Sequence, residues 1–315
     1  MKILFAGTPE VAAKTLQTLA TDPRFAGFEI AGVLTREDAP LGRKRILTPS
    51  PTATTAEALG IPVIKANRID ADTLVSIGKL GVDLGIVIAY GVLLKLDALQ
   101  ALPLGWYNLH FSQLPKWRGA APVQRALMAG ERDTAVTLFK LDEGMDTGPI
   151  AGVVPTEIQP DETAGDLLNR LRLLGESLLA EQLPAIASGT VNLVEQSQST
   201  LTPTLAPKLG RADSVLDFAR AATELEAIVR GANPEPMAHT NFRGHNLRVL
   251  RARAHASSAS GQMNGMARLD GSRVLVATGS GDLELLEVQP ASKNPMRASD
   301  WARGANLPAF LGENL

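Results

Sequence analysis

Short apolar runs alternate with amphipathic stretches along the first half of the chain, and this alternation predicts an α/β domain. The apolar runs have the length of strands, and the stretches between them show the spacing of helices. The predicted strands are 2–6, 29–34, 62–64, 84–89, 104–109, 134–141 and 149–158. The predicted helices are 52–59, 71–79, 120–129 and 163–186, with a further helix after the turn at 7–10.

This order of elements predicts a mostly parallel, Rossmann-like sheet with helices on both faces. Its first turn enters a helix, with Thr8 as the expected N-cap and Pro9 at the first helical position. The turn contains Gly7 but no G-x-G-x-x-G run, which disfavours a dinucleotide cofactor and a nicotinamide oxidoreductase. Ligands of such sheets bind beyond the carboxyl ends of the strands.

The second half of the chain has a different pattern. Residues 188–205 are polar and rich in Ser and Thr, which is typical of a linker. A helix is predicted at 221–230, and short β-like runs separated by glycine turns follow it, which favours a small β-barrel. These runs are 247–252, 273–277 and 283–288. We expect a first domain over 1–189, a linker over 190–206 and a second domain over 207–315.

Composition narrows the class of protein. A hydrophobic content of 45% with mean hydropathy near zero fits a soluble globular chain, and a net charge of −2 argues against bulk nucleic-acid binding. Cysteine is absent, which excludes disulfides and thiolate metal sites, and the four histidines are scattered, so we predict no metal. No leader or long apolar run is present, so we expect a cytoplasmic protein without membrane contact.

Candidate chemistry gathers at the end of the strand predicted over 104–109. Asn108 and His110 are two residues apart, so their side chains point to the same face of a strand. An amide donor beside a titratable ring can stabilise an oxyanion and move a proton. Asp146 adds a carboxylate in a glycine-flanked loop. None of the three is a Ser or Cys nucleophile, so we predict direct acyl transfer rather than an acyl-enzyme.

Taken singly, these residues have ordinary interpretations. A histidine at a strand end is usually a hydrogen-bonded structural residue, and Asp146 suits a turn in which it accepts bonds from nearby backbone N–H groups. The pairing of Asn108 with His110, followed by the Asp-Thr-Gly loop, favours the catalytic interpretation. A base also needs orientation, so the two interpretations of Asp146 are compatible.

The order N-x-H, then Ser-Gln-Leu-Pro at 112–115, Arg-Gly at 118–119 and Asp-Thr-Gly at 146–148 resembles the folate-dependent formyltransferase family. The similarity covers nearly the whole chain, and the stretch 115–124 is similar to members that formylate methionyl-tRNA. The resemblance implies an OB-like barrel for the second domain. It also implies 10-formyltetrahydrofolate as co-substrate and initiator methionyl-tRNA as acceptor. The implied catalytic residues are Asn108, His110 and Asp146.

The resemblance also assigns binding residues. The implied folate contacts are Ser112, Gln113, Leu114 and Pro115, with Tyr90 and Gly91 from the end of another strand. Gln113 stands where the family usually has Leu. The implied tRNA contacts are Arg43, Lys44 and Arg45 in a proline-bracketed loop. Lys208 in the second domain is a further candidate for a phosphate contact because of its charge. Basic side chains contact phosphates, although without the resemblance this loop would be interpreted as a solvated surface segment.

Other functions fit parts of the pattern. A glycinamide ribonucleotide or an amino sugar nucleotide would be an alternative acceptor for the same three catalytic residues. A catalytically inactive RNA-binding module is a further alternative, which the intact trio of Asn108, His110 and Asp146 disfavours. We expect the protein to be a monomer.

Overall fold

The computed structural model describes residues 1–42, 44–256 and 262–312, and the chain divides into two compact units. The first unit comprises Met1–Pro122, Thr134–Thr156 and Leu168–Ala206. The second comprises Val123–Asp133, Glu157–Leu167 and Pro207–Leu315. Residues 190–206, predicted as a linker from their composition, therefore cluster with the first unit.

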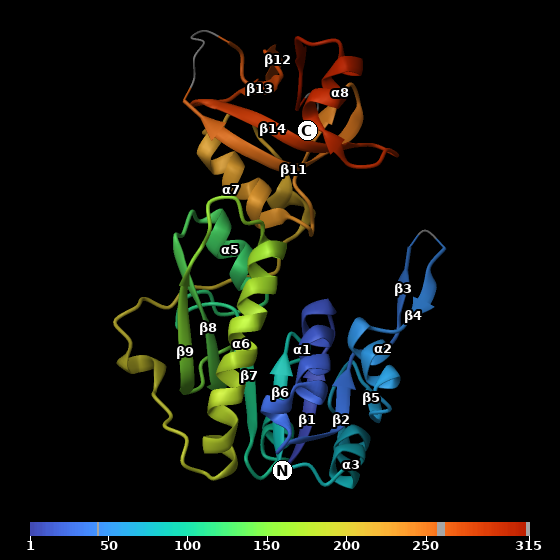
Figure 1. Cartoon of the computed structure of the whole chain (residues 1–315), viewed down its shortest axis with the longest axis vertical. Coiled ribbons are helices and arrows are strands. Elements are labelled where there is room, and N and C mark those ends of the chain that lie inside the picture. The colour runs from blue at the N-terminus through green and yellow to red at the C-terminus, as the bar shows by residue number, and fades with distance from the viewer. Residues whose placement is uncertain (43, 257–261, 313–315) are drawn as a thin grey trace. The chain divides into compact units, whose positions relative to one another are not determined.

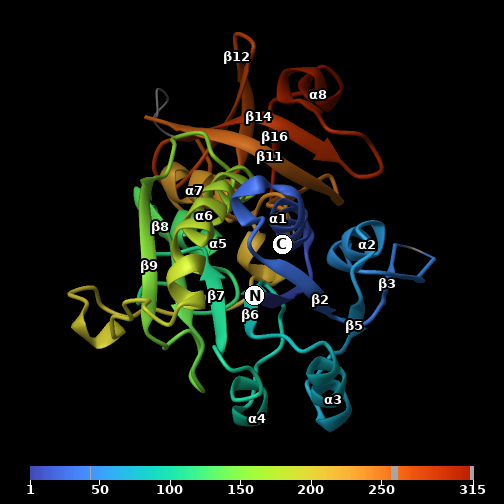
Figure 2. The ribbon, with the colours of Figure 1, turned by 60° about the horizontal axis from the view of Figure 1, so that its bottom comes forward.

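A seven-stranded sheet forms the centre of the first unit (Figure 1), in the order β5-β2-β1-β6-β7-β8-β9. The strands from β5 to β7 pair in parallel, and β8 is antiparallel to β7. Figure 2 shows β5 and β9 at opposite edges. The strands are β1 (Lys2–Gly7), β2 (Glu29–Thr35), β5 (Val63–Lys65), β6 (Leu84–Ile88), β7 (Trp106–His110), β8 (Asp133–Lys140) and β9 (Ile150–Glu157). The predicted mostly parallel α/β sheet is confirmed.

Helices cover both faces of this sheet, because apolar side chains point to both sides of its strands. Leu4 and Ala6 of β1 belong to a core cluster with Ile77 of α3 and Ala98 of α4. Figure 1 shows α1 and α6 in front of the sheet. The helices of the first unit are α1 (Glu10–Thr21), α2 (Pro51–Ala58), α3 (Ala71–Lys79), α4 (Leu96–Leu99) and most of α6 (Ala164–Ala187). All of α5 (Pro122–Met128) beyond Pro122 belongs to the second unit.

The turn after β1 differs from the sequence-based expectation. Pro9, not Thr8, occupies the N-cap position of α1, so the predicted cap is wrong. The Thr8 hydroxyl donates instead to the carbonyl of Tyr90, at 2.9 Å. A hydroxyl that donates across the sheet cannot be recognised as such from local sequence. The bond joins the carboxyl ends of β1 and β6, the edge at which ligands of such sheets bind.

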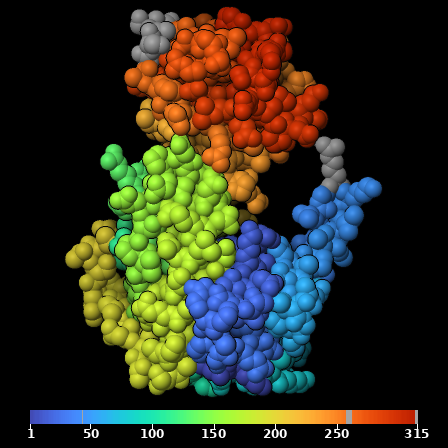
Figure 3. Space-filling view, in the orientation of Figure 1, coloured from blue at the N-terminus to red at the C-terminus, as the bar shows by residue number. Residues whose placement is uncertain are grey.

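A small hairpin interrupts the segment between β2 and α2, where the sequence predicts only a surface loop. Its strands β3 (Ala39–Leu41) and β4 (Ile46–Thr48) pair antiparallel, and Figure 3 shows it as a projection from the first unit. Three of its apolar side chains are 61–67% exposed, those of Leu41, Ile46 and Leu47. The hairpin buries no apolar face, which explains why no strand pattern marks it.

An antiparallel sheet with the order β10-β11-β14-β13-β12-β16 dominates the second unit, with β15 paired to β14. Gly312 N–H donates to the Asn241 carbonyl at 2.8 Å and joins the two edges, so the sheet nearly closes into the predicted barrel. The helix α7 (Ala222–Ala232) buries its apolar face in the barrel core. The remaining elements are β10 (His239–Phe242), β11 (His245–His255), β12 (Met266–Asp270), β13 (Arg273–Ala277), β14 (Asp282–Pro290), β15 (Met296–Arg297), α8 (Ala298–Ala305) and β16 (Ala309–Phe310).

Among the described residues, none of the helices combines the length and apolar character needed to span a membrane. Within the same residues, no three His, Asp or Glu side chains lie close enough together to hold a metal ion.

Candidate active site

The strand β7 carries Asn108 and His110 on one face near its carboxyl end. Asn108 pairs with Val87 of β6, and His110 pairs with Thr137 of β8, so neighbouring strands fix both positions. The His110 ring is 5% exposed and packs edge-on against Phe139. A site built on a packed strand holds its side chains more accurately than a free loop would.

His110 has one ring nitrogen committed to the backbone. Its Nε2 lies 2.9 Å from the carbonyl of Trp117, and a carbonyl can only accept, so Nε2 carries the hydrogen. Its Nδ1 lies 3.8 Å from Oδ2 of Asp146. Burial lowers the pKa of His110, and the Asp146 carboxylate and the Trp117 carbonyl oppose that shift without reversing it. The ring is therefore mainly neutral at pH 7, with the lone pair on Nδ1 available.

Asp146 lies in the loop between β8 and β9, and its carboxylate is held in place. The backbone N–H of Gly119 donates to its Oδ2 at 2.7 Å, and its side chain is 15% exposed. Asp146 has a φ of 52°, in the left-handed region that non-glycine residues seldom adopt. Asp142 braces the loop by accepting the hydroxyl of Thr147 at 2.7 Å.

The loop that follows β7 approaches the backbone closely at Gly119. Its φ is 125°, and a Cβ there would lie 2.7 Å from the carbonyl oxygen of Ala206. Both the conformation and the contact require glycine. Gly119 therefore brings a backbone donor to Asp146 that a larger residue would displace.

Asn108 carries an unpaired polar atom. Its Oδ1 is buried and has no hydrogen-bond partner among the described residues. An unpaired buried acceptor costs about 1–3 kcal/mol, so such a group calls for a functional explanation. A carboxamide can donate through Nδ2 and accept through Oδ1. The side chain therefore suits a bound group that offers both an oxygen and an N–H.

Most side chains of the predicted folate loop, residues 112–115, are buried and hold the loop in place. The Ser112 hydroxyl donates to the carbonyl of Lys116 at 2.7 Å, and its own carbonyl accepts from Thr137, so Ser112 has no exposed surface. Leu114 and Pro115 are buried as well. Gln113 is half-buried, which leaves it as the member of the four with a partly open side chain.

The second segment predicted to contact folate, at Tyr90 and Gly91, exposes backbone groups rather than the Tyr90 side chain. The Tyr90 hydroxyl donates to the carbonyl of Ala66 at 2.8 Å, the side chain is 1% exposed, and burial raises its pKa to about 12. Ala89 and Gly91 are exposed and have φ values of 49° and 81°. Backbone groups on either side of Tyr90, rather than its ring, are therefore available to a ligand.

The predicted RNA contacts lie in separate units. Lys44 and Arg45 are exposed in the turn between β3 and β4, in the first unit, and Lys208 is exposed in the second. Arg43 lies outside the described residues. The hairpin thus presents two cations beside its exposed apolar side chains.

Two polar residues that sequence reasoning missed contact the site loops. The hydroxyl of Thr204 accepts the Trp117 N–H at 2.9 Å, next to the carbonyl that holds His110. Gln196 is 5% exposed and donates to the carbonyl of Asp146 at 2.9 Å. Both lie in the Ser/Thr-rich segment predicted as a linker, and nothing in the local pattern separates them from their exposed neighbours.

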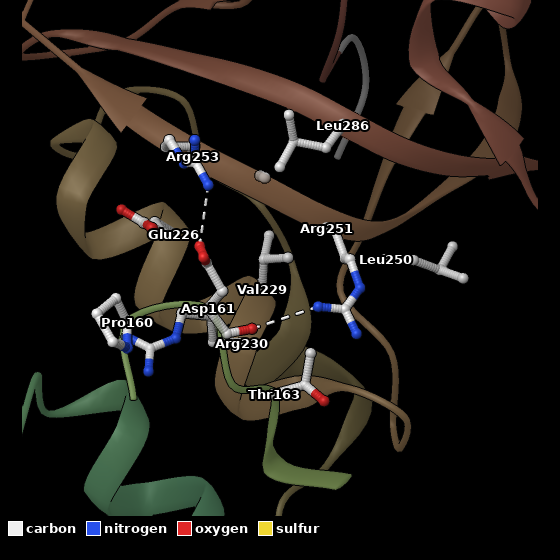
Figure 4. A pocket seen from close by; sticks show the side chains of 11 residues that line it. Pro160, Asp161, Thr163, Glu226, Val229, Arg230, Leu250, Arg251, Arg253 and Leu286 are labelled. Atoms are coloured by element: carbon white, nitrogen blue, oxygen red, sulfur yellow. Dashed lines mark hydrogen bonds and ion pairs between the residues drawn. The ribbon is translucent and has the colours of Figure 1, made fainter. Parts of the chain in front are cut away.

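A cavity of about 240 Å³ in the second unit has several arginines in its wall (Figure 4). Arg253 pairs with Asp161 at 3.0 Å, and Arg251 pairs with Asp166 at 3.2 Å. Arg230 donates to two backbone carbonyls. These guanidinium groups hold the segment 157–167 against α7 and the barrel, which is a structural role.

Comparison with known proteins gives a consistent result for both units. Residues 1–183 match the formyl transferase family, and residues 208–306 match the formyl transferase C-terminal domain. A solved N-formyltransferase from Helicobacter canadensis, in complex with folinic acid and dTDP-3-aminofucose, is 16% identical with a TM-score of 0.65, covering 92% of this chain and 99% of its own. That likeness shows a shared fold.

Full-length relatives are much more similar in sequence. The methionyl-tRNA formyltransferase of Clavibacter sepedonicus is 48% identical over 304 residues, which cover 96% of this chain and 97% of that protein. The methionyl-tRNA formyltransferase of Leifsonia xyli subsp. xyli is 48% identical over 311 residues, which cover 99% and 100%. Because both units match and the relatives align over nearly their whole length, the chain belongs to the methionyl-tRNA formyltransferase family.

Proposed function

We propose that the protein transfers the formyl group of 10-formyltetrahydrofolate to the α-amine of methionyl-initiator tRNA, which gives N-formylmethionyl-tRNA for translation initiation. The observation that most supports this proposal is that Asn108, His110 and Asp146 lie together at the carboxyl edge of the sheet. The full-length relatives of this chain are methionyl-tRNA formyltransferases.

The folate co-substrate supplies the activated formyl group. The unpaired Oδ1 of Asn108 supports a bound substrate at this position, because a ligand N–H would satisfy it. Gln113 and the backbone around Gly91 are the groups with open surface that would hold the folate. Ser112, Leu114 and Pro115 would act indirectly, by fixing the loop that carries Gln113.

Asn108 would stabilise the charge that develops on the formyl oxygen. When the amine nitrogen attacks the formyl carbon, the carbonyl oxygen gains negative charge, and the Nδ2 donor of Asn108 is suited to bind it. The Oδ1 acceptor would at the same time receive an N–H of the attacking amine. One side chain would thus align the two reacting groups, and alignment itself lowers the barrier.

His110 would move the proton. An α-amine has a pKa near 8, so a useful fraction is neutral at pH 7. Nδ1 of His110 would take the proton that the amine nitrogen loses, and the Asp146 carboxylate at 3.8 Å would stabilise the resulting imidazolium. The proton would then pass to N10 of the departing folate, so that tetrahydrofolate leaves neutral at that atom and the enzyme is restored.

The β3–β4 hairpin would contact the RNA. Lys44 and Arg45 are exposed and suit phosphate groups, and the exposed Leu41, Ile46 and Leu47 suit apolar contact with unpaired bases. Lys208 would add a phosphate contact from the second unit. Arg43, which adjoins Lys44 in sequence, belongs to the same proposal.

A competition between acceptors tests this function. The purified protein is incubated with formyl-labelled 10-formyltetrahydrofolate and an equimolar mixture of initiator methionyl-tRNA, glycinamide ribonucleotide and an amino sugar nucleotide. We expect the label on methionyl-tRNA. Label that accumulates on the amino sugar or on glycinamide ribonucleotide would replace the proposal by the corresponding alternative, and no label on any acceptor would indicate an inactive binding protein.

A further inference from the structure

Gln196 uses its whole side chain to join two loops of the active site. Its Nε2 donates to the carbonyls of Asp146 and Gly148, at 2.9 and 2.8 Å. Its Oε1 accepts from Nε and Nη2 of Arg118, at 3.1 and 2.6 Å. A glutamine amide has two N–H donors and one oxygen with two lone pairs, so all its hydrogen-bonding capacity is used inside the protein.

The segment that carries Gln196 is itself anchored on both sides. Val194 and Ile150 exchange two backbone hydrogen bonds, at 2.8 and 2.9 Å. Further along, Ala206 N–H donates to the carbonyl of Arg118 at 2.7 Å, and Ala121 N–H donates to the carbonyl of Ala206 at 3.1 Å. The side chain of Gln196 therefore projects from a fixed backbone, so it holds the two loops at a defined separation.

The two loops that Gln196 joins contain the two partners of one hydrogen bond in the site, the Asp146 carboxylate and the Gly119 N–H. Asp146 stands in the loop after β8, and the Gly119 N–H that binds its carboxylate follows Arg118 in the loop after β7. Asp146 also has a left-handed backbone, with a φ of 52°, and contacts from the surrounding structure help to hold it. The two hydrogen bonds from Gln196 are such contacts, because they fix the carbonyls of Asp146 and of Gly148 just beyond it.

We propose that Gln196 is a positioning residue for formyl transfer, which sets the placement of the Asp146 carboxylate relative to Gly119 and His110. It touches no reacting atom and acts through the backbone of residues 146 and 148. This inference rests on the proposed function, because the reaction that Asp146 serves is the one proposed above.

A positioning role and a purely structural role predict different kinetics. Loss of the two donors leaves two carbonyls unpaired, of which that of Gly148 is buried, so the loop relaxes and the Asp146 carboxylate shifts. Asp146 acts on charge that develops during the reaction, so kcat falls while KM for folate and for methionyl-tRNA stays nearly constant. A misplacement of about 1 Å at a catalytic group reduces the rate on the order of 10²-fold.

Two substitutions distinguish the donor Nε2 of Gln196, which binds the loop of Asp146, from the acceptor Oε1, which binds Arg118. Gln196→Glu keeps the size and the contact with Arg118 but replaces the donor with an oxygen that faces two carbonyls. Gln196→Met keeps similar bulk without charge and loses both halves. The matched control is Gln198→Ala, which changes an exposed glutamine of the same short turn. All variants are assayed as full-length proteins, with thermal unfolding used to choose a temperature at which each is folded.

We expect kcat to fall about 10- to 100-fold in Gln196→Glu and in Gln196→Met, with both KM values within about threefold of wild type and Gln198→Ala unchanged. Wild-type kcat in Gln196→Glu would overturn the proposal, because the Arg118 contact alone would then suffice. Parallel increases in both KM values with kcat unchanged would overturn it as well.

A second readout does not depend on formyl transfer. The Asp146 carboxylate raises the pKa of His110 against the lowering by burial, so displacement of that carboxylate in the uncharged Gln196→Met variant lowers this pKa further. An NMR titration of His110 in the free protein measures the change. An unchanged His110 titration would contradict the positioning role even if the protein formylated none of the tested acceptors, whereas inactivity of the wild type alone would contradict only the proposed function.

Discussion

Replacement of Asp146 by Asn removes one charge and little else. The loop requires a left-handed backbone at this position, and Asn is among the residues that tolerate it. The Oδ1 of Asn can still accept the Gly119 N–H that now binds Oδ2 at 2.7 Å. The variant therefore isolates the contribution of the carboxylate charge to the protonation of His110 during transfer.

The expected loss follows from the distance between the two groups. At 3.8 Å and an effective dielectric constant of about 20, a carboxylate stabilises an imidazolium by about 4 kcal/mol. The side chain is 15% exposed, and water screens part of this energy. Since about 1.4 kcal/mol corresponds to tenfold, we expect the rate of transfer to fall between about 10²- and 10³-fold.

The assay is single-turnover formation of formylmethionyl-tRNA with saturating folate, measured between pH 5.5 and 9. Neutral His110 is required as acceptor, so wild-type activity declines as pH falls through the pKa of His110, which burial holds below its ordinary value. Without the carboxylate, that pKa is lower still, so the decline moves to lower pH. Ionisation of the amine acts equally on both proteins, so the loss in the variant should be largest above the pKa of His110 and smaller below it.

The control is Glu143→Gln, which removes an exposed carboxylate from the same loop and should leave the rate unchanged. A near-normal rate in Asp146→Asn would refute the assigned role of the charge. A loss that does not vary with pH would show that Asp146 only positions other groups, and an equal loss in Glu143→Gln would show a general effect of loop charge.

Three further variants test the binding and oxyanion assignments. Asn108→Ala should lower turnover about 10²–10³-fold while folate affinity, measured by titration, changes little, and near-normal turnover would remove Asn108 from the mechanism. Gln113→Leu introduces the usual family residue into a half-buried position and should leave folate affinity unchanged or slightly higher; a large loss would reveal a specific polar contact. The double change Lys44→Ala with Arg45→Ala should lower kcat/KM for methionyl-tRNA, reduce its salt-dependence slope by somewhat under two units and spare folate binding, whereas unchanged tRNA kinetics would move the RNA contact away from the hairpin.

The features that follow from short-range periodicity could be predicted from the sequence. Asn108 and His110 share a strand face because side chains alternate with a period of two, and β7 does place them at the expected edge. The parallel sheet follows from continuous apolar runs such as β6, which is buried throughout. The second unit was predictable as β-rich, but two-residue strands such as β15 and β16 carry no pattern of their own.

Features that depend on tertiary contacts were not predictable in this way. Thr8 is of a residue type that favours helix caps, but its hydroxyl donates to the carbonyl of Tyr90, which follows β6 and is distant in the sequence. Gln196 reaches the carbonyl of a residue fifty positions earlier, from a segment whose composition indicates a linker. The tautomer of His110 depends on the carbonyl of Trp117. Trp117 itself has a left-handed backbone with a φ of 62°, which orients that carbonyl. Each arrangement becomes visible once the loops are placed in space.

The proposed reaction is direct formyl transfer to methionyl-tRNA at a site without a nucleophile. The most direct measurement is a rapid-quench single turnover with formyl-labelled 10-formyltetrahydrofolate and initiator methionyl-tRNA, in which folate, tRNA and denatured protein are separated at each time. We expect label to leave the folate and enter methionyl-tRNA at the same rate, with no label on the protein at any time. Labelled protein that forms and then decays, or folate consumption without labelled tRNA, would contradict the account.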